Sequence, residues 1–173
     1  MSNPMPHLSI PAGIVVERRK AASSWIDFTW RPVSVLVGKP AAEPGTCLGD
    51  DGESATFYAG AVSLDLYRTE TSRYRDNLTS PRPSVWVAIV ATDGVSLCSV
   101  VAATIDPAEG EALSEPGTLV EAVPLPHAIA DQIAEFVARH PVEDSFVKRK
   151  RDRANPEALA RRLPTLEKND DRE

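Results

Sequence analysis

The chain has 173 residues, of which 42% are hydrophobic and 25% are charged, so it is long enough to bury a core without disulfides or a metal. Fifteen prolines against nine glycines predict short segments and exclude long helices. The net charge is −6, but residues 148–173 hold nine Lys or Arg and six Asp or Glu, a net charge of +3, which leaves −9 for residues 1–147. An acidic body with a basic segment argues against nucleic acid as a partner and favours a local contact.

The N-terminal segment lacks a basic region followed by an apolar one, and no run reaches the roughly 18 apolar residues that cross a membrane. The two cysteines have neither CxxC spacing nor a histidine at metal-ligand spacing. We interpret Cys47 as a loop thiol and Cys98 as a small core residue in a reducing compartment, with a disulfide or redox pair as the alternative. We therefore expect a cytoplasmic protein that does not contact a membrane.

The chain order predicts a disordered leader over residues 1–9, a single α+β domain over residues 10–144 and a basic, largely disordered arm over residues 145–173. The first half of the domain has β character. Its expected features are a strand at 10–18, an aromatic stretch at 25–30 that leads to a strand at 33–37 with a bend or bulge at Pro32, a loop at 38–53, and a strand at 56–68 with a bulge at Gly60.

A short helical turn is expected at residues 69–78, with Thr69 as its cap. Two apolar β-branched runs then flank Asp93-Gly94, a dipeptide that favours a type I′ hairpin turn. Val85 to Ala91 is apolar on both faces, which predicts a strand covered on both sides, either central in a sheet or inside a small barrel. The remaining signals are Asp106-Pro107 as the start of a short helix, an edge strand at 119–123, and an amphipathic helix at 126–140 that would cover one face of the hairpin.

These elements predict an α+β fold: a twisted, mostly antiparallel sheet or small open barrel, packed by one main C-terminal helix and followed by a flexible basic tail.

No chemical motif stands out. The chain has no glycine-rich phosphate loop, no GxSxG and no HExxH, and its three histidines are dispersed. The acidic run at residues 50–53 lacks the alternation of an EF-hand loop and is interpreted as a solvated turn. We therefore expect no catalytic residue, no metal and no cofactor, and we do not expect an enzyme.

Three features remain as candidate binding surfaces. Trp25 and Trp30 flank an amphipathic stretch that ends in Arg31-Pro32, for which core packing is the default and a surface aromatic anchor the alternative. A second stretch, residues 67–75, interleaves aromatic and cationic side chains. A third, residues 146–153, places an apolar pair directly before five cations, which fits a solvated extension or a partner-docking arm. The partner-binding residues predicted from these last two features are Tyr67, Arg68, Tyr74, Arg75, Phe146, Lys148, Arg149, Lys150, Arg151 and Arg153.

Several segments together carry a resemblance: IPAGIVVERR, Trp25 through WRPVSVL, LYRTE with YRDNL, PSV, VEAVPLP and PVEDSFVKRKRDR. In this combination the chain resembles an uncharacterised proteobacterial family, a domain of unknown function encoded beside molybdenum-dependent formate dehydrogenase genes. The resemblance covers most of residues 10–153. It implies a pathway rather than a mechanism and carries over no catalytic residue.

The resemblance and the charge pattern together lead to an expected function. We expect a non-catalytic accessory factor in the maturation or assembly of a molybdenum-dependent formate dehydrogenase, which docks a protein partner through its basic arm; the dehydrogenase subunits or their accessory proteins are the candidates. The alternative is a small ligand- or nucleotide-binding regulatory module with a pocket beside the hairpin, lined by Arg68, Arg73 or Arg75. An enzyme with an unrecognised site would need a cleft with several perturbed ionisable groups. The oligomeric state is left open.

Overall fold

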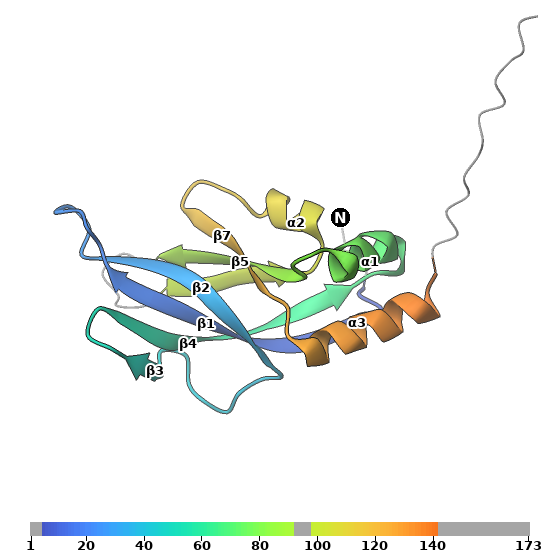
Figure 1. Ribbon diagram of the computed structural model, residues 1–173, viewed down its shortest axis with the longest axis horizontal. Helices are drawn as coiled ribbons and strands as arrows, with labels where there is room; N and C mark the ends of the chain where they lie inside the picture. The colour runs from blue at the N-terminus through green and yellow to red at the C-terminus, as the bar shows by residue number, and fades with distance from the viewer. Residues whose placement is uncertain (1–4, 92–97, 142–173) are drawn as a thin grey trace, which may run out of the picture. The chain divides into compact units, whose positions relative to one another are not determined.

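The computed structural model describes residues 5–91 and 98–141, and its contacts divide the chain into two compact units, Met1–Val142 and Glu143–Glu173. All described secondary structure belongs to the first unit (Figure 1). In chain order the elements are β1 (Leu8–Lys20), β2 (Phe28–Val37), β3 (Cys47–Asp50), β4 (Ser54–Leu66), η1 (Arg68–Glu70), α1 (Thr71–Thr79), β5 (Ser84–Ala91), β6 (Cys98–Thr104), α2 (Pro107–Ala112), β7 (Thr118–Pro124) and α3 (His127–Arg139).

The first sheet has the strand order β2-β1-β4-β3, and every pairing in it is antiparallel. Its long central strand β1 is flanked by two register shifts. One shift lies beside Pro32 on β2, where Val15 pairs with Ser34 and Val16 pairs with Pro32. The other lies beside Gly60 on β4, whose backbone φ of +123° suits a glycine. Both irregularities were expected from the sequence, and bulges of this kind increase the local twist of a sheet.

The second sheet has the strand order β6-β5-β7, again with antiparallel pairing. The apolar strand β5 is central in it, as predicted, and Val85, Val87 and Ile89 are buried. Trp86, which lies on the other face, meets α2 at the buried Gly110. Strand β7 forms an edge of this sheet, as predicted. The turn expected at Asp93-Gly94 lies outside the described residues.

The core lies between the two sheets. Alternate residues of β1, including Ile10, Ile14 and Val16, are buried together with the inner face of β5. The strands therefore form two facing sheets that do not close into a barrel. The sequence predicted a twisted sheet or a small open barrel and did not indicate the division into two sheets. The α+β class and the antiparallel pairing are confirmed. The pairing of β1 with β4 joins residues that are 35 to 58 positions apart, from Arg19 with Ser54 to Leu8 with Leu66, and local sequence patterns do not indicate it.

Helices α1 and α3 lie at one end of the sheets (Figure 1). Helix α3 buries Ile129, Ile133 and Phe136, the apolar stripe expected from its spacing. It packs against α1, with the Tyr74 and Phe136 ring centroids 6.5 Å apart, instead of lying along the hairpin as predicted. Each fully buried side chain of this stripe stabilises the fold by about 2 kcal/mol.

Three local predictions need correction. Residues 8 and 9 were predicted to belong to a disordered leader, but β1 begins at Leu8, and the His7 amide donates to the Leu66 carbonyl at 2.8 Å. The predicted loop at 38–53 contains the short strand β3, which pairs with β4. Thr69 does not cap a helix, because it lies inside η1, and α1 starts without a side-chain cap. In contrast, Asp106 caps α2 as expected, since its carboxylate accepts from the Ala108 amide at 2.9 Å.

Candidate functional site

Among the large apolar side chains that the structure describes, Trp25, in the turn between β1 and β2, has the largest exposed fraction. Trp25 is 93% exposed, Ile26 56% and Phe28 39%, and we call these three residues the hairpin tip. In Figure 1 this turn is the dark blue end that projects beyond the neighbouring strands. The default prediction that Trp25 packs in the core is therefore wrong, because no other described segment covers the turn; Trp30, on β2, does pack against the core. Contiguous exposed apolar side chains of this size are typical of interaction sites.

The base of the hairpin tip is held by stacked side chains. The Arg18 guanidinium lies over the rings of Phe28, Trp30 and Phe57, at 4.6, 5.9 and 5.0 Å from their centroids. The Trp30 and Phe57 rings are themselves 5.6 Å apart. Cation–π contacts of this kind stabilise by about 0.5–1 kcal/mol each at exposed sites. They orient Phe28 and with it the start of β2.

Positive charge surrounds this base. Arg31 donates to the Glu17 carboxylate at 2.8 Å and Arg19 pairs with it at 3.3 Å. The Arg31 hydrogen bond, helped by both positive charges, lowers the pKa of Glu17. Residues 17–31 contain four cations and two carboxylates, so the apolar hairpin tip lies on a basic segment of an otherwise acidic body. Such an element suits an apolar pocket with an acidic rim on a partner.

The predicted surface at residues 67–75 is only partly a surface. Arg68 and Arg75 are exposed and Tyr67 is half-buried. Tyr74 was predicted to face a partner, but it is only 2% exposed and its hydroxyl accepts from the Tyr67 amide at 3.0 Å. The reason is tertiary: α3 covers this side of α1 and places Phe136 against the Tyr74 ring.

The buried phenol leads to a prediction about pH. Burial raises the pKa of Tyr74 to about 12, so the folded protein holds the phenolic proton above the pH at which the unfolded chain loses it. The free energy of unfolding should therefore be unaffected by this group below about pH 9 and fall by about 2 kcal/mol as pH rises from 10 to 12. Urea unfolding at several pH values measures the slope. The variant Tyr74→Phe should show a shallower slope, and an equal slope in both proteins would contradict the assignment.

Behind this surface lies a polar network that the sequence did not indicate. Arg73 donates to the buried Asp106 carboxylate at 3.0 Å and pairs with Glu70 at 2.7 Å. These partners raise the pKa of Arg73, with the Asp106 hydrogen bond as the largest cause. Arg73 is thus committed to the fold rather than directed at a ligand.

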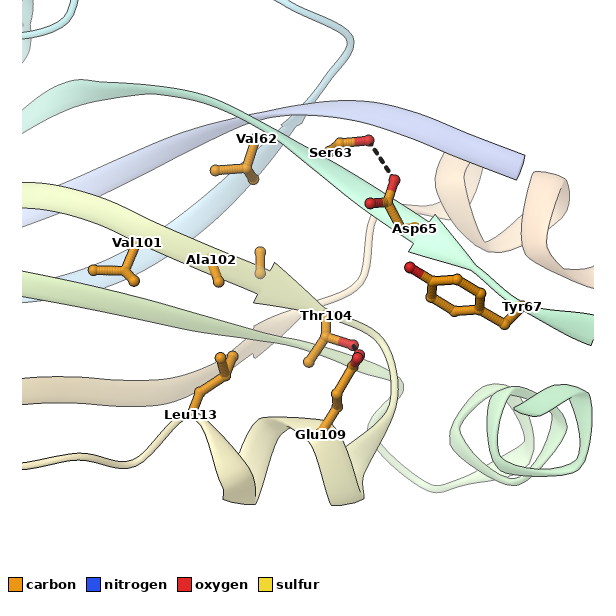
Figure 2. A pocket seen from close by; sticks show the side chains of 10 residues that line it. Val62, Ser63, Asp65, Tyr67, Val101, Ala102, Thr104, Glu109 and Leu113 are labelled. Carbon is orange, nitrogen blue, oxygen red and sulfur yellow. Dashed lines mark hydrogen bonds between the residues drawn. The ribbon is translucent and has the colours of Figure 1, made fainter. Parts of the chain in front are cut away.

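A cavity of about 360 Å³ lies between β4 and β6 (Figure 2). The side chains of Asp65, Tyr67 and Glu109 point into it, above an apolar wall that includes Val101 and Leu113. Asp65 accepts from the Ser63 hydroxyl at 2.8 Å, and the Thr104 hydroxyl donates to Glu109. Burial, followed by the two carboxylate charges, raises the pKa of Tyr67.

This cavity differs from the arginine-lined pocket predicted for a ligand- or nucleotide-binding regulatory module. Its lining is acidic, and none of Arg68, Arg73 and Arg75 contributes to it. A nucleotide or another phosphate would meet two carboxylates there, which is unfavourable. Among the residues that the structure describes, no group of three or more His, Cys, Asp or Glu is placed to hold a metal ion.

The remaining predicted partner-binding residues, Phe146, Lys148, Arg149, Lys150, Arg151 and Arg153, lie outside the described residues. Of the two cysteines, Cys98 is buried, as predicted, and Cys47 is exposed on β3. Burial raises the pKa of the Cys98 thiol to about 11, which makes it a poor nucleophile. No helix within residues 5–91 and 98–141 has the length and apolar character needed to cross a bilayer.

Fold and surface together define an α+β protein of two facing antiparallel sheets with a projecting aromatic hairpin. The family model described as "Protein of unknown function (DUF3305)" matches residues 11–150, and the chain belongs to this family. The match confirms the resemblance to a domain family without an assigned function. Searches of curated proteins and of solved structures gave no match.

Proposed function

We propose that this protein is a cytoplasmic, non-catalytic accessory factor that binds a protein partner during the maturation or assembly of a molybdenum-dependent formate dehydrogenase. The observation that carries the binding role is the exposed hairpin tip, which is supported by the Arg18 guanidinium stacked on the Phe28 ring. The pathway rests on the sequence resemblance given above, and the basic segment at residues 146–153 supports a second contact with the same acidic partner.

The hairpin tip has the features of an interface anchor. Tryptophan and arginine are the side chains most often found at energetic hot spots, and here Trp25 is fully presented while Arg18 supports the strand behind it. Because 93% of Trp25 is exposed, burial of its side chain against a partner would add apolar contact without giving up packing within the described chain.

The test is an affinity capture of the tagged protein from its own host, grown under conditions that induce formate oxidation. The double variant Trp25→Ala/Ile26→Ala should lower recovery of dehydrogenase subunits or their accessory proteins about tenfold or more, a loss of about 1.4 kcal/mol or more. The matched control is Val101→Ala/Leu119→Ala, which truncates two other exposed apolar side chains and should leave recovery unchanged.

A second variant tests the arm. Replacing Lys148, Arg149, Lys150 and Arg151 with Glu should abolish capture, and capture by the unchanged protein should weaken as salt is raised. Equal capture by the wild type and both variants would refute docking through these elements. Recovery of no protein, with a small molecule carried along instead, would favour the regulatory-module alternative.

A further inference from the structure

A second cavity, of about 510 Å³, lies where the start of β5, the end of β7 and the first turns of α3 meet. It is distinct from the acidic cavity between β4 and β6. The Leu125 amide donates to the Pro83 carbonyl at 2.9 Å, which ties two of its walls together. The lining residues are Arg82, Pro83, Ser84, Ala122, Pro124, Leu125, His127 and Ala130.

The polar side chains of this lining are those of Arg82, Ser84 and His127. The Arg82 guanidinium is exposed and makes no hydrogen bond or ion pair with any other described residue. The imidazole of His127 has no such partner either, and within the part of the chain that the structure describes no carboxylate lines the cavity. On a body with a net charge of −9, Arg82 has no carboxylate partner among the described residues, whereas Arg19, Arg31, Arg73 and Arg139 are each paired with one.

The remainder of the lining is apolar and rigid. Pro83, Pro124, Leu125 and two alanines supply it, and proline rings fix the backbone on both sides. A mostly apolar cavity of several hundred Å³ with a few converging polar groups is the usual form of a small-molecule site. One guanidinium matches one carboxylate through two parallel hydrogen bonds. A dianionic phosphate would be poorly compensated here, since the described lining supplies one guanidinium, that of Arg82.

We propose that this cavity binds a small organic anion, a single carboxylate on an apolar body, with the carboxylate held by Arg82 and His127 and the apolar body against Pro83, Pro124 and Leu125. The site goes beyond partner docking and shares no residue with the hairpin tip.

The experiment uses the full chain and 4-phenylbutyrate as the probe, with neutral 4-phenylbutyramide as its matched control. Titration calorimetry measures affinity, and amide NMR shifts locate binding. The acid should bind with a Kd below about 10 mM and shift the backbone N–H resonances of Ala122 and Ala130. The neutral control, 4-phenylbutyramide, should bind about tenfold more weakly or not at all.

Arg82→Gln should weaken binding of the acid about tenfold, a loss of about 1.4 kcal/mol, whereas Arg68→Gln removes an exposed cation elsewhere and should have no effect. Equal binding of acid and amide, equal affinity of Arg82→Gln, or no binding up to about 10 mM would overturn the proposal. Both Arg82→Gln and the wild type should capture the protein partner equally, so failure here is separable from failure of the docking role.

Discussion

Replacement of Asn77 with alanine is expected to lower the free energy of unfolding by about 3 kcal/mol. Asn77 is 4% exposed, and its amide nitrogen donates to the carbonyls of Ser84 and Ile105, both at 2.8 Å. Its amide oxygen accepts from the Ser84 backbone N–H at 3.0 Å. One side chain therefore satisfies three backbone groups and joins α1 to the start of β5 and to the segment that follows β6. Alanine leaves these groups without partners in a site closed to water.

The measurement for Asn77 is urea unfolding followed by circular dichroism. The matched control is Asp76→Ala, the preceding and exposed residue of the same helix, which should change the free energy of unfolding by less than about 0.5 kcal/mol. A loss below about 1 kcal/mol for Asn77→Ala would show that water replaces the amide and that the network does not hold the elements together.

Replacement of Gly110 with alanine is the second large effect, and it should also destabilise. The Cβ atom that alanine adds at this buried position would lie 2.7 Å from the Cβ atom of Trp86 and 2.8 Å from the Cδ1 atom of Trp86. The Cβ atom of Trp86 is bonded directly to the backbone, so Trp86 cannot move aside unless β5 shifts. Alanine normally stabilises a helix by about 1 kcal/mol relative to glycine, but overpacking costs more. The expected result is a net loss of about 2 kcal/mol.

A double-mutant cycle separates the two contributions at Gly110. In a Trp86→Ala background the clash is absent, and Gly110→Ala should become neutral or stabilising by up to about 1 kcal/mol. Equal losses in both backgrounds would show that the conflict lies in the backbone of α2 and not in its contact with β5. Thermal or urea unfolding of the four proteins provides the comparison.

Neither large effect could be read from the sequence. Gly110 looks like an unfavourable residue in a short helix, and Asn77 looks like one of several polar residues on α1. Their roles arise because α2 crosses Trp86 and because α1 ends beside Ser84. Contacts of this kind join segments that are separated along the chain, whereas spacing and propensity describe only neighbours.

The candidate site shows the same division. The sequence singled out Trp25 and Tyr74 as aromatic residues of interest, with Trp25 expected in the core and Tyr74 at a surface. The structure reverses both, since α3 covers Tyr74 and no described segment covers Trp25. The cavity at Arg82 and His127 was missed altogether, because its walls come from three separate segments. The signal available in the sequence was one arginine between two prolines, which is too weak to indicate a site.

The sequence by itself determined the features that depend on neighbouring residues. These are the Asp106 cap before Pro107, the buried stripe of α3, the bulges at Pro32 and Gly60, and the strands on either side of Asp93-Gly94. Capping, side-chain periodicity and glycine conformation depend on residues within a few positions of one another, so local sequence patterns can predict them. Only the tertiary structure decided the division into two sheets, the pairing of β1 with β4, and which aromatic and cationic side chains remain exposed, because burial depends on which distant segment packs over each residue.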